Sequence, residues 1–165
     1  MGYKVKIYPE SAENTPKTFP KGSLEENLWR NFDTAKHILE ARFLKDYDII
    51  IFDRGAFDRI FWLYLDTVYN TEIALKSAPI AKIFEEYPPD FLVTFYVSEN
   101  EAIKRRGGEG RLVTTQFISN YNRLLENFIA SLKVNKVIVR TDNKKIEEVV
   151  QITQNSILEK LESHS

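Results

Sequence analysis

Short apolar runs separate longer segments with helical periodicity along this chain of 165 residues. Residues 48–53 and 91–97 are almost continuously apolar, which predicts strands covered on both faces, as in a parallel sheet layered with helices. Residues 3–8 alternate instead, with Val5 and Ile7 expected to point inward and lysines outward. This alternation predicts a half-exposed strand at the edge of the sheet.

The segments between these strands are expected to be helical. The pattern of serine followed by glutamate three residues later, at 23–26 and again at 98–101, is typical of a capping box at a helix start. A short fourth strand is expected at 136–140. Strands thus alternate with helices throughout, which predicts an α/β fold with a three-layer, mostly parallel sheet flanked by helices. The first helix is expected to bury Leu24, Leu28, Phe32, Ala35 and Leu39.

Composition and charge narrow the functional classes. With 43% apolar residues, the chain is expected to form a single domain over residues 1–165. The formal net charge of −1 gives no support for a nucleic-acid coat protein or a basic membrane-surface protein. Because there is no cysteine, a disulfide framework, a thiolate zinc site and a thiol nucleophile are excluded. No apolar run reaches a membrane span and no signal-peptide region is recognisable, so we expect a cytoplasmic protein.

The strand at 48–53 delivers an acid and an arginine, Asp53 and Arg54, to its carboxyl end. Ligands of open α/β sheets bind beyond this end of the strands. A charged group after a four-residue apolar run needs a compensating partner, which favours a functional role for Asp53 over a turn-capping one. The planar guanidinium of Arg54 suits phosphate, and its alternative is an ion pair with Asp58 or Glu10.

Four other residues carry candidate chemistry. Glu10 follows the first strand, where a carboxylate acts either as a general base or as a solvated loop acid. Arg105 and Arg111 flank three glycines within residues 105–115. This pattern predicts either a mobile lid that delivers cations to developing charge or an ordinary basic helix end. Trp62 either stacks on a planar ligand or belongs to a buried helix face.

The order of these features resembles the thymidylate kinase and deoxynucleoside kinase branch of the P-loop nucleoside and nucleotide kinases. The resemblance spans nearly the whole chain and is carried by Tyr8-Pro9-Glu10, by Asp53-Arg54 and by the arginine-glycine segment at 104–111. It implies that Glu10 accepts the proton of the acceptor hydroxyl. It further implies that Asp53 holds Mg²⁺ through water and that Arg54 contacts the transferring phosphoryl group.

The same resemblance implies the rest of a substrate site. Arg105 and Arg111 would be the catalytic arginines of the lid, with ATP as the phosphoryl donor. Asp58 and Trp62, together with Glu10 and Arg54, would contact a small-molecule nucleoside or nucleotide. For Arg59, a surface position is expected.

The sequence departs from this family in one respect, because it contains no G-x-x-x-x-G-K-[ST] phosphate loop. We therefore expect an N-terminally incomplete domain that lacks the first strand, the loop and the helix, with the absent strand's place between 48–53 and 91–97. Either the chain is shortened, or strand pairing is rearranged, or a second chain fills the gap. A homodimer is compatible with the aromatic helices.

Two functions remain open from the sequence. The complete enzyme would transfer the γ-phosphoryl group of ATP to a nucleoside or nucleotide. The alternative is a non-catalytic relative that binds nucleotides or regulates another protein. In either case the expected partner is a small molecule, and neither a nucleic acid nor a membrane.

Overall fold

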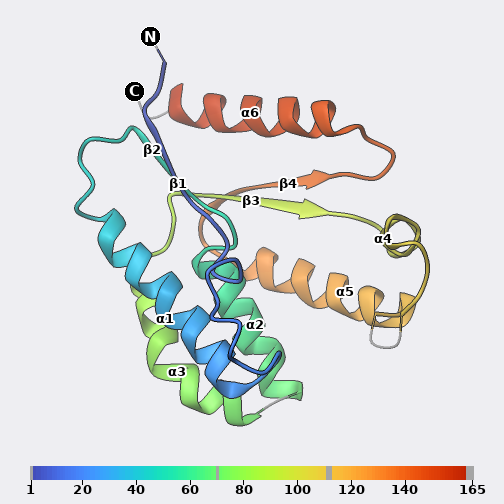
Figure 1. Ribbon diagram of the computed structural model, residues 1–165. Coiled ribbons are helices and arrows are strands. Elements are labelled where there is room, and N and C mark those ends of the chain that lie inside the picture. The colour runs from blue at the N-terminus through green and yellow to red at the C-terminus, as the bar shows by residue number, and fades with distance from the viewer. Residues whose placement is uncertain (1, 70, 111–112, 163–165) are drawn as a thin grey trace. The chain divides into compact units, whose positions relative to one another are not determined.

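The computed structural model describes residues 2–69, 71–110 and 113–162. Helices and parallel strands alternate along the chain, so the protein has an α/β fold, as the sequence predicts (Figure 1). The chain divides into two compact units, Met1–Pro89 and Asp90–Ser165, and each is described by itself.

The Met1–Pro89 unit contains a two-stranded parallel sheet. Strand β1 (Val5–Tyr8) pairs with β2 (Ile49–Phe52), and Tyr8 lies opposite Phe52. The amide of Asp53 donates to the carbonyl of Tyr8 at 3.0 Å, which extends the pairing beyond the last strand residue. The parallel pairing of the first two strands is thus confirmed. Three helices complete the unit: α1 (Leu24–Ala41), α2 (Ala56–Tyr69) and α3 (Thr71–Glu86).

The prediction of which face of β1 is buried was wrong. Val5 and Ile7 are 42% and 61% exposed, whereas Tyr8 is only 5% exposed. Tyr8 stacks on Phe52, with ring centroids 5.0 Å apart, and this aromatic contact makes its face the packed one. Ile51, opposite Ile7 in the register, is also exposed, so β2 is not covered on both faces.

The core of this unit lies among its helices. Ala35 and Ile38 of α1 pack with Ala56 at the start of α2 and with Ile80 and Phe84 of α3. Phe84 is fully buried. This packing holds α1 and α2 together beside the end of β2, where the candidate site lies.

Helix α1 begins as predicted, and its buried face matches the predicted one in part, because Ala35 lies in the core and Leu28 packs against it. The hydroxyl of Ser23 accepts the amide of Glu26 at 3.2 Å, which confirms the N-cap. Phe32 and Leu39, expected in the core, are exposed. The buried face includes polar residues, because these find partners: the amide of Asn31 donates to the Ser77 hydroxyl at 3.1 Å, and Thr34 shares a 2.7 Å hydrogen bond with Ser11.

The Asp90–Ser165 unit repeats the parallel strand arrangement. Strand β3 (Phe91–Tyr96) pairs with β4 (Asn135–Arg140). The capping box predicted at 98–101 does not form, because the Ser98 side chain makes no capping bond and its amide donates to Asp142 at 2.9 Å. Phe95 in β3 is exposed, so full burial of this strand was also a wrong prediction. The helices are α4 (Glu99–Arg106), α5 (Thr115–Ser131) and α6 (Ile146–Glu162).

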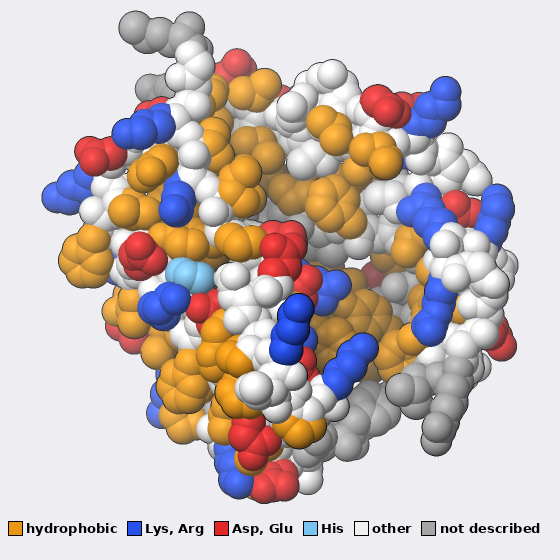
Figure 2. All heavy atoms as spheres, in the orientation of Figure 1, with side chains coloured by type: hydrophobic (Ala, Val, Ile, Leu, Met, Phe, Trp, Pro, Cys, Tyr) orange, Lys and Arg blue, Asp and Glu red, His pale blue; other side chains and the backbone are white. Residues whose placement is uncertain are grey.

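The described strands therefore form two separate two-stranded parallel sheets, and the single three-layer sheet expected from the sequence is not shown. None of the described helices is long and apolar enough to cross a membrane. On the face drawn in Figure 2, acidic and basic side chains are interspersed, which agrees with the small net charge.

Candidate functional site

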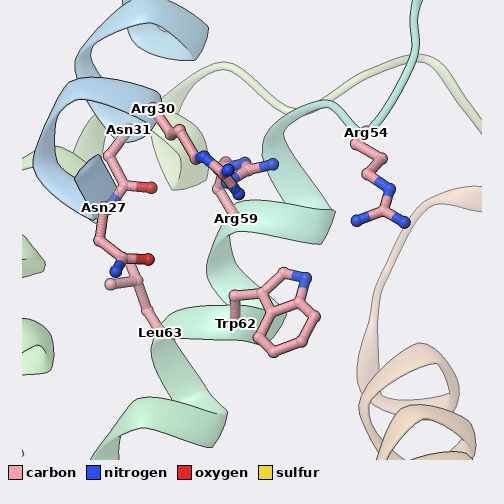
Figure 3. Close-up of a pocket in the computed structure, with 7 residues that line it drawn as sticks. All are labelled: Asn27, Arg30, Asn31, Arg54, Arg59, Trp62 and Leu63. Carbon is pink, nitrogen blue, oxygen red and sulfur yellow. The ribbon is translucent and has the colours of Figure 1, made fainter. Parts of the chain in front are cut away.

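A small cavity of about 130 Å³ opens in the Met1–Pro89 unit, beside the turn that follows β2 (Figure 3). This is the region in which the sequence predicts a ligand site. Helix α1 contributes polar side chains to the wall, and α2 contributes an arginine and an indole. The lining residues are Asn27, Arg30, Asn31, Arg54, Arg59, Trp62 and Leu63.

The turn after β2 has an unusual backbone that places Arg54 at this cavity. Arg54 has a φ of 54°, in the left-handed region that non-glycine residues seldom adopt. A left-handed residue with a Cβ costs about 1–2 kcal/mol. A Cβ on the next residue, Gly55, would lie 2.9 Å from the Cβ of Phe52, so glycine is required there. Such local strain is commonly found at binding sites.

The structure brings Glu10 and Arg54 together. The Arg54 Nη1 atom lies 3.2 Å from Oε1 of Glu10, so the ion pair considered as an alternative is present. The Arg54 side chain is 51% exposed, and exposed pairs of this kind contribute only about 0–1 kcal/mol. A bound ligand can therefore separate the two groups at little cost.

Arg59 is buried, so the prediction of a surface position was wrong. It is 5% exposed, and its Nη2 lies 3.3 Å from Oδ2 of Asp58. Burial raises the pKa of Asp58 despite the opposing effect of Arg59, because removal from water disfavours the carboxylate. Burial also lowers the pKa of Arg59, an effect that Asp58 opposes and Arg30 reinforces. The charges of Asp58 and Arg59 are therefore both poorly solvated.

Hydrogen bonding around this pair is incomplete. Within the described part of the chain, the Nε atom of Arg59 and Oδ2 of Asp58 are buried without a hydrogen-bond partner. Arg30 is well anchored by comparison, because its Nη2 donates to Glu26 at 2.6 Å and its Nε donates to Thr15 at 3.3 Å. In Figure 3 the guanidinium groups of Arg30 and Arg59 extend toward each other from α1 and α2.

Asp53 lies at the exposed end of β2. Among the described residues, no group of three or more histidine, aspartate or glutamate side chains is arranged to hold a metal ion. Mg²⁺ is usually held by one or two carboxylates, with water and substrate oxygens completing its shell. Asp53 therefore fits Mg²⁺ only as one ligand among waters and phosphate oxygens.

Arg105 belongs to the Asp90–Ser165 unit, where it has structural partners. Its Nε donates to Glu101 at 2.9 Å, and its Nη2 donates to the carbonyl of Thr141 at 2.6 Å. The bond to Thr141 ties the end of α4 to the residue after β4, whereas the bond to Glu101 lies within α4. Arg111, the other predicted lid arginine, lies outside the described residues.

The described part of the predicted lid contains a hydrogen-bonded turn. Gly107 ends α4 with a φ of 87°, and the amides of Gly107 and Gly108 donate to helix carbonyls of Lys104 and Ile103 at 3.0 Å. The carboxylate of Glu109 accepts from the backbone amide and hydroxyl of Thr115. These bonds lower the pKa of Glu109. Two of the three glycines thus have a capping role, while lid movement stays a prediction.

Sequence reasoning placed Arg54, Trp62 and their surroundings at the site but missed its α1 wall. The missed residues of this wall are Asn27, Arg30 and Asn31, and Leu63 of α2 was missed as well. A signal was present, since the two asparagines stand four positions apart and therefore share a helix face. Comparison with known proteins found no family model and no curated protein that match this chain.

Proposed function

We propose that this chain is a protein of the nucleoside and nucleotide kinase class whose cavity in the Met1–Pro89 unit binds the phosphoryl acceptor, a nucleoside or nucleotide. One observation carries the proposal: Glu10 and Arg54, distant in sequence, meet at the carboxyl ends of the paired strands beside an arginine-lined cavity. Parallel strands present their carboxyl ends at one edge, where ligands of α/β proteins bind.

Each residue has a role in this proposal. Glu10 accepts the proton of the acceptor hydroxyl once the ligand has separated it from Arg54. Arg54 then donates to phosphate oxygens, for which its planar fork is suited. Trp62 offers an apolar face to the ligand, and Asp58 holds the charge of Arg59 in place.

The residues of this chain fit one cofactor of this class, Mg²⁺, better than the other, ATP. Asp53 would hold Mg²⁺, which when bound neutralises charge on the phosphate oxygens. The sequence contains no glycine-rich loop for the donor phosphates of ATP, so its residues account for acceptor binding and not for phosphoryl transfer. Arg105 and Arg111 are assigned to the lid by resemblance only, and Arg105 would have to leave Thr141 to act there.

The second candidate is a non-catalytic protein that binds a nucleotide for a regulatory purpose. The absence of the phosphate loop from these 165 residues favours it, because the acceptor pocket does not depend on that loop. In both cases it stays a prediction that another segment or another copy of the chain completes a mostly parallel sheet. A homodimer, which completion by another copy would require, also stays a prediction.

Both candidate functions require the cavity to bind a nucleoside or nucleotide, and equilibrium binding to the purified chain tests this requirement. Both tryptophans, Trp29 and Trp62, lie in the Met1–Pro89 unit, so their fluorescence reports on it. We expect nucleosides or their monophosphates to bind saturably, and Arg54→Ala to weaken binding about fivefold or more. Arg123→Ala, at an exposed position in the other unit, is the control. Absence of binding by every nucleoside and monophosphate would contradict the proposal.

A turnover assay with Mg·ATP separates the two candidates. We expect no phosphorylation by the 165-residue chain, because donor-phosphate binding in this class depends on the missing loop. Turnover that survives repurification and disappears in Arg54→Ala would show instead that the chain is an enzyme without that loop.

A further inference from the structure

The inner part of the cavity carries two guanidinium groups, from Arg30 and Arg59 (Figure 3). Arg59 is the deeper of the two, with 6% of its side chain exposed against 26% for Arg30. The Nε–H of Arg59 is buried and finds no acceptor among the described residues. A buried donor on a charged group is costly when it is unpaired, so the protein satisfies the Arg59 guanidinium incompletely.

The donors that line the cavity determine the chemistry of a ligand that binds between them. Guanidinium groups only donate hydrogen bonds, so a ligand between them has to present acceptor atoms. Burial is the main cause of the lowered Arg59 pKa; repulsion by Arg30 acts in the same direction, and Asp58 and Glu10 oppose it. A negatively charged ligand reduces the repulsion between the two cations, whereas a neutral one does not.

None of the carboxylates paired with these arginines lines the cavity. Asp58 reaches only the Nη2 atom of Arg59, at 3.3 Å, and does not line the cavity. Glu26 is committed to Arg30 at 2.6 Å and to the amide of Gly22. Glu10 is paired with Arg54 at the more exposed side. No carboxylate of the described residues is paired with the Nε of Arg59.

We propose that the Arg30–Arg59 part of the cavity is an oxyanion-binding subsite that takes a phosphate group. The whole cavity, of about 130 Å³, has room for several water molecules and therefore for a phosphate group. The inference rests on the proposed function only for the identity of the molecule that carries the phosphate.

Calorimetric titration of the full chain with inorganic phosphate tests the subsite. We expect saturable binding that weakens about tenfold or more in Arg30→Gln and in the double variant Asp58→Asn/Arg59→Gln, because each loses charge-assisted hydrogen bonds. The double variant avoids leaving a buried carboxylate alone. Lys76→Gln is the control: it also loses one positive charge, on the exposed side of α3 where Lys76 pairs with Glu72, and its affinity should stay within about twofold of the original.

Circular dichroism of each variant shows whether it folds. If the double variant does not fold, the partly exposed Arg30 decides the question, because its replacement leaves the Asp58–Arg59 pair in place. Absence of saturable phosphate binding, or equal affinity in Arg30→Gln and Lys76→Gln, overturns the inference.

Two further titrations identify the source of the phosphate. A nucleoside 5′-monophosphate that displaces phosphate and loses affinity in Arg30→Gln supports a nucleotide as the ligand. Phosphate binding that no nucleotide displaces supports the subsite for free phosphate and contradicts the proposed function. A third outcome is that the chain binds a nucleoside, with equal affinity in Arg30→Gln, while it binds no phosphate. This result overturns the subsite and leaves the proposed function intact.

Discussion

The buried Asp58–Arg59 pair predicts a specific pattern of stability in a double-mutant cycle. Replacing Arg59 with Met leaves the Asp58 carboxylate buried without its cation. Breaking a fully buried pair in this way costs about 3–5 kcal/mol. The Asp58 side chain is 21% exposed, and Arg54 lies near enough to influence it, so part of its solvation remains. We therefore expect Arg59→Met to lower the free energy of unfolding by about 2–3 kcal/mol at pH 7.

The double variant Asp58→Asn/Arg59→Met should be less destabilised than Arg59→Met alone. It removes both charges, so no uncompensated ion stays buried, and we expect a loss of about 1 kcal/mol or less. The two positions should therefore show a coupling energy of at least about 1 kcal/mol. Lys76→Met, which breaks an exposed pair with Glu72, should change stability by no more than about 0.5 kcal/mol.

The pH dependence of this cycle has a defined sign. Burial already raises the pKa of Asp58 in the folded protein above its ordinary value. The folded state therefore binds the Asp58 proton more tightly than the unfolded state does. The contribution of Asp58 to stability falls as pH rises from its unfolded-state pKa to its higher folded-state pKa. Loss of Arg59 removes an effect that lowers the Asp58 pKa, so it raises the pKa further. The deficit of Arg59→Met should consequently shrink between pH 7 and pH 5.

Urea unfolding followed by tryptophan fluorescence measures the cycle, because both tryptophans lie in the same unit as the pair. The four proteins of the cycle should be compared at pH 7 and pH 5 with a common slope against urea. Additive effects of the two single changes, or a deficit of Arg59→Met that grows on acidification, would refute the idea of a coupled buried pair.

Two other changes give direct tests. Glu10→Gln should raise the affinity for inorganic phosphate by about 2–5-fold in calorimetric titration, because the Glu10 charge, whose effect extends to Arg59, no longer repels an anion in the cavity; weaker binding would contradict this. Gly107→Ala should destabilise the end of α4 by about 1 kcal/mol and speed amide exchange at Gly107 and Gly108, because a φ of 87° disfavours a side chain. Fast exchange at both amides in the unaltered protein would show that the capped turn is not stable and would favour a mobile lid.

The sequence predicted the element types better than the buried faces, and the region in which it predicts a ligand site contains the candidate cavity. Apolar runs and capping residues identified β2 and the start of α1, because these signals are local. The alternation in β1 has a period of two, which separates its faces but does not say which one packs. That choice was made by the contact of Tyr8 with Phe52, which pattern alone does not contain.

Arg59 shows a different limit of sequence reasoning. An arginine that follows an acidic residue near a helix start is expected at the surface, because an unpaired charge is costly to bury. In the structure it pairs with Asp58 and lines the same cavity as Asn27, Arg30 and Asn31 of α1. The α1 residues are far from Arg59 in the chain, so no local window could contain the reason.

The departures from local rules gather around one cavity. Arg54 adopts a left-handed backbone, Arg59 is buried, and its Nε is unpaired. Each feature lowers stability by itself, and such exceptions are expected where a site needs a particular geometry. The double-mutant cycle bears on this point as well, because replacement of a buried ion pair by uncharged side chains is often neutral or stabilising. A double variant as stable as the original but unable to bind phosphate would show that the pair is there for the ligand.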